Sequence, residues 1–228
     1  MNLLCGSFAV VVALMYNDLT LAFWLIVAGI VFDFFDGFVA RLLHSSSAIG
    51  VQLDSLADVI TSGLAPAAVL WQVCLQTEPC WLSETWKLGY GVFVLAAFSA
   101  LRLAKFNIDE TQTVEFCGLP TPAGSLLCAS LGMLWQQGAV ALSSDGVLLI
   151  AVLTSLLLVS PIRMFALKFH GFGWRGNEVR YLFLLASIVL IIILRTYAIP
   201  VIIVLYIVVS AVRWLCMRSG NPDKAPKA

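Results

Sequence analysis

Four aspartates fall close together in a part of the chain that is otherwise rich in apolar residues. Asp33 and Asp36 are three positions apart, and Asp54 and Asp58 are four positions apart. On helices, each of these spacings puts both side chains on one face. Clustered carboxylates without His or Cys form a hard oxygen site suited to Mg²⁺ or Mn²⁺. The spacing therefore predicts a site in which two divalent ions balance the four charges.

The surroundings of these aspartates favour a ligand site over a structural role. The alternative is that the carboxylates are protonated, or paired with Arg41, and merely join helices. One arginine cannot offset four acids, and each charge near mid-membrane costs about 2.5–3.5 kcal/mol on insertion scales. Gly37 and Ala40 follow Asp36 on the same predicted helix and leave space where a ligand can approach. Alone, these two would be ordinary helix-packing residues.

The elements that carry these residues are predicted to be membrane-spanning helices. The chain of 228 residues is 61% hydrophobic and 11% charged, with a mean hydropathy of +0.98, whereas soluble domains carry about 25% charged residues. A helix needs about 20 apolar residues to cross a bilayer. We therefore expect an all-α, polytopic transmembrane bundle of about eight spans. The predicted spans are residues 3–15, 20–43, 50–74, 87–106, 121–138, 146–165, 180–195 and 198–216.

The distribution of basic residues predicts the orientation of this bundle. With both termini in the cytoplasm, all Lys and Arg except Lys87 and Arg195 fall at or near cytoplasmic ends, as the positive-inside rule requires. Both aspartate pairs then lie toward the cytoplasmic side, where we expect the active site. Residues 1–218 form a single predicted domain, and residues 219–228 form a short polar tail. The formal net charge of zero offers no basic field to recruit nucleic acid.

The aspartate segment follows a fixed pattern over 26 positions. It reads Asp33-x2-Asp36-Gly37-x2-Ala40-Arg41-x8-Gly50-x3-Asp54-x3-Asp58. This resembles the signature of the CDP-alcohol phosphatidyltransferase family, with every specified position present. Further blocks resemble the branch of that family whose acceptor alcohol is serine. These blocks are Asn2–Gly6, Leu53–Val59, Ala100–Asn107, Gly118–Gly124 and Val159–Arg163.

The resemblance implies an enzyme that moves a phosphatidyl group from CDP-diacylglycerol to L-serine, giving phosphatidylserine and CMP. Two Mg²⁺ or Mn²⁺ ions would grip the diphosphate, held mainly by Asp33, Asp36 and Asp54. Asp58 would bind one of the ions and act as the general base on the serine hydroxyl. The CDP-lipid contacts carried over from the family are Gly37, Ala40, Arg41 and Ser47. We also expect a homodimer, embedded in the lipid of the cell inner membrane.

Recognition of serine requires a partner for its carboxylate, and a guanidinium is the natural bidentate partner. The candidates at predicted cytoplasmic helix ends are Arg102, Lys105, Asn107 and Arg163. Snorkelling of the cationic side chains to the membrane interface is the structural alternative. Transfer to glycerol 3-phosphate or inositol is the alternative within the family. An ion transporter or a non-catalytic membrane protein is the alternative outside it, since intramembrane aspartates also suit ion pathways.

Overall fold

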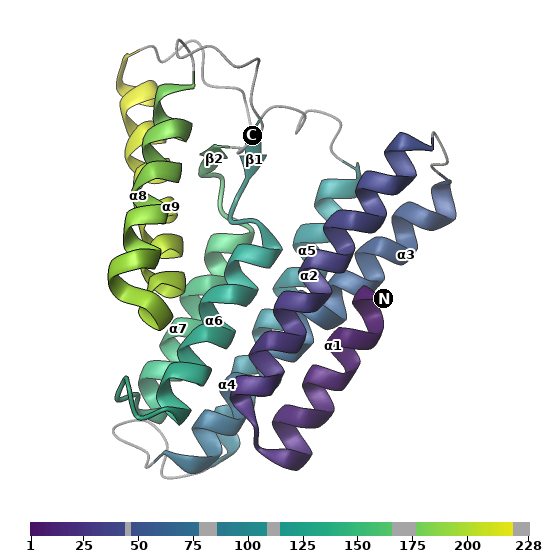
Figure 1. The fold of residues 1–228 in the computed structure, drawn as a ribbon, viewed down its shortest axis with the longest axis vertical. Coiled ribbons are helices and arrows are strands. Elements are labelled where there is room, and N and C mark those ends of the chain that lie inside the picture. Colours follow the sequence, from purple (N-terminus) through teal and green to yellow (C-terminus); the bar gives the residue numbers. More distant parts are fainter. Residues whose placement is uncertain (44–46, 78–85, 109–114, 166–176, 221–228) are drawn as a thin grey trace.

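Helices that run alternately up and down the molecule make up almost all of the computed structural model (Figure 1). The structure describes residues 1–43, 47–77, 86–108, 115–165 and 177–220. The helices of the first half are α1 (Asn2–Val11), α2 (Leu19–Leu42), α3 (Ala48–Asp58), α4 (Ala65–Gln76) and α5 (Val94–Ile108). Those of the second half are α6 (Thr121–Gln136), α7 (Ser144–Leu158), α8 (Glu178–Leu194) and α9 (Ala198–Gly220).

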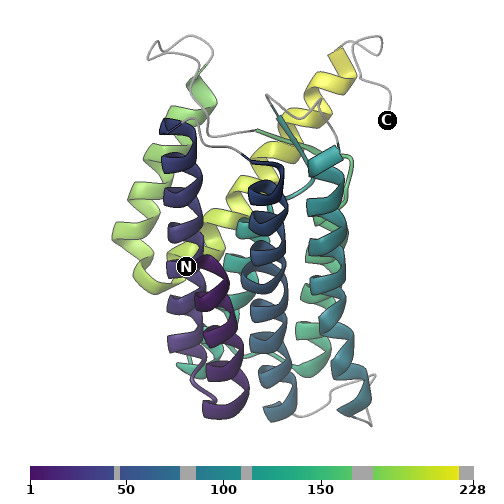
Figure 2. The same cartoon turned by 90° about the vertical axis from the view of Figure 1, so that its right-hand side faces the viewer.

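Short helical turns of other types extend or join these helices. A π-helical turn, η1 (Val12–Tyr16), extends α1, and another, η2 (Val59–Leu64), joins α3 to α4. The 3-10 turn η3 (Trp86–Phe93) leads into α5, and η4 (Arg195–Tyr197) lies between α8 and α9. Figure 2 shows α3, η2 and α4 as one continuous rod between α2 and α5.

Two short strands form the exception to the predicted all-α fold among the described residues. Strand β1 (Glu115–Cys117) pairs antiparallel with β2 (Arg163–Phe165), and Cys117 lies opposite Arg163. The predicted span 146–165 is therefore wrong at its end, because α7 stops at Leu158. Pro161 explains the stop, since proline has no N–H to donate and disfavours the helical conformation in the residue before it. The other helices lie within a few residues of the predicted spans.

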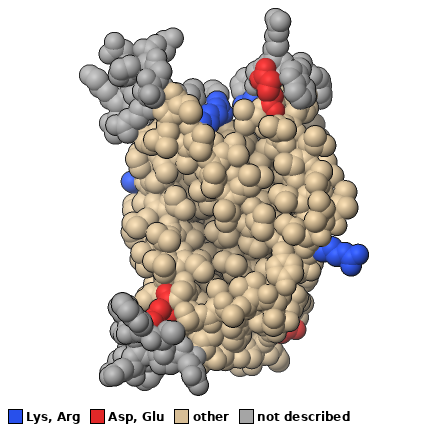
Figure 3. Space-filling model, turned by 90° about the vertical axis from the view of Figure 1, so that its left-hand side faces the viewer, with Lys and Arg blue, Asp and Glu red and all other residues tan. Residues whose placement is uncertain are grey.

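The membrane character of the chain is confirmed by four helical segments that are long and apolar enough to cross a bilayer within the described part. These segments are Leu19–Ala40, Ile49–Gln76, Gly89–Ile108 and Glu178–Cys216. The last contains both α8 and α9, which lie side by side (Figure 1). The face seen in Figure 3 is tan over most of its middle, with charged side chains near its margins. A largely apolar face of this kind suits a lipid surround.

One end of the bundle is tied together by side-chain amides. Asn17 adopts a left-handed backbone conformation (φ 53°) in the turn between α1 and α2. Its side chain exchanges two hydrogen bonds with the amide of Gln76 at the end of α4, at 2.7 and 3.2 Å. Gln136 at the end of α6 accepts hydrogen bonds from the backbone N–H groups of Leu19 and Thr20, at 2.8 and 3.1 Å. These bonds cap α2 and hold four helices in register.

Close helix packing places the first turn of α1 beside the aspartates. A Cβ atom on Gly6 would lie 2.3 Å from Oγ1 of Thr61, and one on Gly29 would lie 2.6 Å from Cγ2 of the same threonine. Only glycine at these two positions lets α1 and α2 approach η2 so closely. Thr61 belongs to the π-helical turn that begins directly after Asp58. Such turns occur frequently at functional sites, because they shift the facing of neighbouring side chains.

Candidate active site

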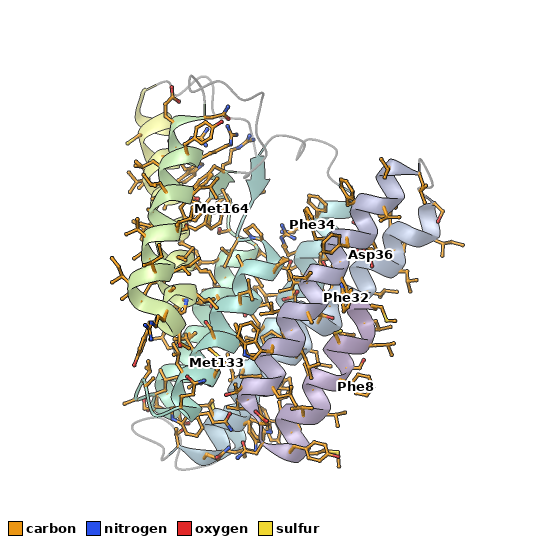
Figure 4. The ribbon with its side chains drawn as sticks, viewed as in Figure 1. Phe8, Phe32, Phe34, Asp36, Met133 and Met164 are labelled. Atoms are coloured by element: carbon orange, nitrogen blue, oxygen red, sulfur yellow. The ribbon has the colours of Figure 1, made fainter. Side chains whose placement is uncertain are left out.

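The structure brings three of the four signature aspartates into one cluster. Asp33 and Asp36 project from α2 and Asp54 from α3, and one carboxylate oxygen of each lies within 4.8 Å of the other two. Asp33 is half-buried, whereas Asp36 and Asp54 are exposed. Figure 4 shows Asp36 on the upper part of α2, beside α3. The predicted helical faces therefore converge as the spacing required.

Asp58 stands next to this cluster, and Asn2 joins the two. The side-chain nitrogen of Asn2 donates one hydrogen bond to Oδ1 of Asp33, at 2.8 Å, and another to Oδ1 of Asp58, at 2.9 Å. Asn2 is only 3% exposed. Sequence reasoning quoted Asn2 as part of a family block and missed this contact. The one feature of the sequence that could have indicated a role for Asn2 is its polar amide within an apolar N-terminal run.

A cavity of about 580 Å³ opens between the first turn of α1, the end of α2 and the start of α3. Its lining includes Asp36 and Asp54 together with three of the four predicted CDP-lipid contacts, Gly37, Ala40 and Ser47. A Cβ atom on Gly37 would meet nothing within 4 Å, so this helix surface is open to a ligand. The side chain of Arg41, the fourth predicted contact, lies outside the described residues.

Ser47 has a structural role that the sequence analysis did not assign. Its hydroxyl oxygen accepts a hydrogen bond from the backbone N–H of Gly50, at 3.0 Å, and so caps the N-terminus of α3. Serine is among the preferred residues at this position because its oxygen satisfies a backbone donor that has no helical partner. The cap therefore fixes the residue at which α3 begins. It thereby also fixes the position of Asp54 along the helix axis.

A second cavity, of about 300 Å³, lies between α3, the end of α5 and the start of α6. Its lining includes Asp54 and Asp58 from one side and Arg102 and Asn107 from the other. Asp54 also lines the first cavity, so ligands in the two cavities would meet at this carboxylate. Asn107 donates a hydrogen bond to the hydroxyl of Ser55, at 2.8 Å, which joins α5 to α3 across the lining.

Arg102 is the most constrained cation of the described site. It is 8% exposed, and its guanidinium carbon lies 5.5 Å from the centre of the Phe106 ring. Nη1 donates to the hydroxyl of Thr121 at the start of α6, at 3.0 Å. Nε is buried without a hydrogen-bond partner among the described residues. A buried donor without a partner is costly, and Arg102 lines the second cavity, where an acceptor could compensate its charge.

The other two basic candidates do not reach either cavity. Lys105 is exposed near the end of α5 and is absent from both linings. Arg163 lies half-buried on β2, opposite Cys117, because the helix predicted to carry it ends earlier. The sequence analysis did not select Ser55 or Thr121. Ser55 lines the second cavity and accepts a hydrogen bond from Asn107, and Thr121 accepts one from Arg102.

A helical membrane bundle with carboxylates from two adjacent helices at one site is typical of membrane enzymes that bind metal ions. The family model for CDP-alcohol phosphatidyltransferases matches residues 1–160, and the chain belongs to that family. The prediction of the family from the signature is therefore confirmed. Helices α8 and α9 lie beyond the matched residues.

Three named relatives show which members of the family this chain is similar to. A protein of Bacillus subtilis is 32% identical over 170 residues, which is 75% of this chain and 88% of the relative. One of Helicobacter pylori is 31% identical over 200 residues, covering 86% and 80% of the two chains. One of Mycobacterium tuberculosis is 34% identical over 220 residues, covering 89% and 73%. All three are named CDP-diacylglycerol–serine O-phosphatidyltransferase.

The carboxylate cluster is expected to bind a divalent metal ion, because it offers only oxygen ligands. We predict that Asp36→Asn and Asp54→Asn each weaken binding of Mn²⁺ to the purified protein by at least about tenfold, the lower end of what changes near a metal site cost. Electron paramagnetic resonance of free Mn²⁺ measures this directly. Asp18→Asn, at the opposite end of α2, is the control and should leave binding unchanged. Unaltered Mn²⁺ binding in both site variants would contradict the metal assignment.

Proposed function

We propose that the protein is a CDP-diacylglycerol–serine O-phosphatidyltransferase. It transfers the phosphatidyl group of CDP-diacylglycerol to the hydroxyl of L-serine and releases CMP. The observation that carries this proposal is the pair of cavities that meet at Asp54. One is lined by signature residues and the other contains a buried arginine, which fits a donor site next to an acceptor site. The names of the relatives agree with serine as the acceptor.

The first cavity is the proposed site for the CDP-lipid. Gly37 and Ala40 allow the nucleotide and diphosphate to lie against α2, because neither has a side chain that would fill the cavity. Asp33, Asp36 and Asp54 would hold two Mg²⁺ or Mn²⁺ ions, with Asp58 as a further ligand. When bound, these ions would supply positive charge that offsets the charge of the diphosphate and of the leaving CMP.

The second cavity is the proposed site for serine. Arg102 binds the serine carboxylate, while Asp54 and Asp58 on the opposite lining favour the ammonium group. Asp58 accepts the proton of the serine hydroxyl as that oxygen attacks the lipid-side phosphorus. The bond from that phosphorus to the CMP oxygen then breaks. Arg102 and Asp58 carry opposite charges and line the same cavity, so they attract each other across it.

Other functions fit the site less well. Transfer to glycerol 3-phosphate would place an acceptor phosphate in the second cavity, where Arg102 is the one basic residue of the described lining. The relatives quoted above are named for serine, and none is named for glycerol 3-phosphate or inositol. An ion transporter would have no need of a signature that matches the transferase family.

We further propose that the catalytic domain, residues 1–218 with a polar tail at 219–228, crosses the inner membrane about eight times. Both termini and the active site then face the cytoplasm. The alternating direction of the helices, seen in Figure 1, supports this arrangement. No nucleic acid partner is expected, and the homodimer stays a prediction.

This orientation predicts which turns can be reached from outside the cell. In a variant without native cysteines, Gln137→Cys should react with a membrane-impermeant maleimide in sealed cells, because it lies in the turn that follows α6. Leu43→Cys, at the end of α2, should react only after the membrane is permeabilised. The reverse pattern would show that the orientation is inverted.

The proposed reaction predicts a clear preference among acceptor alcohols. Purified protein with CDP-diacylglycerol and Mn²⁺ should release CMP and form phosphatidylserine when L-serine is added. Glycerol 3-phosphate and inositol, at the same concentration, should give little product. Thin-layer chromatography of labelled lipids and a CMP assay measure both products. Faster transfer to either of the other alcohols would reject serine as the acceptor but keep phosphatidyl transfer.

The role of Arg102 predicts a change in serine affinity. Arg102→Ala should raise the KM for serine roughly 10–100-fold, the loss expected for a hydrogen bond to a charged group. Discrimination against ethanolamine should relax, because ethanolamine lacks the carboxylate that the arginine binds. Lys105→Ala is the matched control, since Lys105 lies three residues further along α5 but outside the cavity. Equal serine KM values in the two variants would exclude Arg102 as the carboxylate partner.

A further inference from the structure

We propose that Asn2 is a positioning residue, which holds the general base Asp58 and the metal ligand Asp33 in the orientations that phosphatidyl transfer requires. This inference rests on the proposed function, because it takes the roles of the two aspartates from it. Asn2 lies on the first turn of α1, 31 residues from Asp33 and 56 from Asp58 in the sequence. Neither signature spacing nor helical periodicity predicts that the three meet.

The hydrogen-bond geometry supports the assignment. An asparagine amide nitrogen has two N–H donors, and Asn2 directs one to each aspartate, at 2.8 and 2.9 Å. Both bonds reach Oδ1 of the aspartate that accepts them. Two carboxylates that share one amide are also drawn together, whereas without it their charges would repel.

The fold leaves the Asn2 side chain little freedom to adopt another orientation. Its backbone carbonyl accepts a hydrogen bond from the buried hydroxyl of Thr61, at 3.1 Å. A Cβ atom on Gly29 would lie 3.2 Å from Oδ1 of Asn2, so α2 covers this side of the amide. Oδ1 has no hydrogen-bond partner among the described residues. The orientation is therefore set by the two aspartates, since a flipped amide would turn Oδ1 toward the carboxylates.

A direct contact between Asn2 and the lipid substrate is the competing explanation. Asn2 lines the first cavity as well as contacting the aspartates. A residue that binds CDP-diacylglycerol would mainly change the KM for that substrate. A residue that positions Asp58 and Asp33 would instead change kcat and the affinity for metal. The two explanations therefore differ in which constant they alter.

The test compares three variants of the full-length protein in detergent. Asn2→Leu removes both donors at similar size, and Asn2→Ser keeps one hydroxyl donor. Thr61→Val removes the hydroxyl that contacts the Asn2 carbonyl but leaves both aspartate bonds, and it serves as the packing control. For each variant, kcat and KM are measured for both substrates, and Mn²⁺ binding is measured by electron paramagnetic resonance without substrates.

We expect Asn2→Leu to lower both kcat and Mn²⁺ affinity by about 10–100-fold, the range typical of groups that orient metal ligands. The KM for serine should stay within about twofold of the wild-type value. Under this mechanism Asn2 does not contact serine, so ground-state binding of the acceptor is unaffected. The kcat and the Mn²⁺ affinity of Asn2→Ser should lie between those of wild type and those of Asn2→Leu. Thr61→Val should lower kcat much less than Asn2→Leu does, because both bonds from Asn2 to the aspartates remain, even if its melting temperature falls.

Several results would overturn the proposal. A rise in the KM for CDP-diacylglycerol with unchanged kcat would assign Asn2 to lipid binding instead. Equal losses of kcat in Asn2→Ser and Thr61→Val, in proportion to lost folded protein, would show a purely structural role. If Asn2→Leu does not fold, Asn2→Ser decides between these results. If wild-type protein makes no phosphatidylserine, the proposed function fails, whereas unchanged Mn²⁺ binding in Asn2→Ser separately rejects the role of Asn2.

Discussion

Carboxylates that lie close together in an apolar bundle repel one another and lose hydration, and much of the surrounding structure limits that cost. Asp36 and Asp54 stay exposed to a cavity, whereas the half-buried Asp33 receives a hydrogen bond from Asn2. The same amide donates a hydrogen bond to Asp58, so one neutral side chain replaces part of the lost hydration of two carboxylates. The remaining cost favours binding of a cation, because positive charge offsets several carboxylates at once. The geometry of the cluster therefore fits a divalent metal ion.

Holding such a cluster requires helices that cannot drift apart. The continuous rod of α3, η2 and α4 provides the reference element, since residues Ala65 to Leu70 of α4 are all buried. The close approach of Gly6 and Gly29 to Thr61 fixes α1 and α2 against the π-helical turn of that rod. At the other end, Gln76 and Gln136 hold the turn between α1 and α2. Rigid packing at both ends leaves the C-terminal halves of α2 and α3 to form the site.

The position of Asp54 links binding to chemistry. Because this residue lines both cavities, a donor in one and an acceptor in the other would approach each other at the carboxylates. Proximity of this kind removes much of the entropic cost of bringing two reactants together. On the acceptor side, Arg102 is held by Thr121 and Phe106, so its direction is set before an acceptor arrives. Phe34 projects from α2 on the side toward the strands, away from Asp36 (Figure 4).

The sequence by itself determined the membrane class, the approximate helix bounds and the family. Apolar length, helical period and the spacing of a signature are all local properties of the chain. The spacing of Asp33, Asp36 and Asp54 on their helices was also enough to predict a shared metal site. Only the tertiary structure decided which residues from other helices join them, as Asn2 and Thr121 do. It also placed Arg163 on β2 instead of on a helix, outside the linings of the two cavities. Contacts between helices depend on how all of their faces pack together, and no single segment encodes that arrangement.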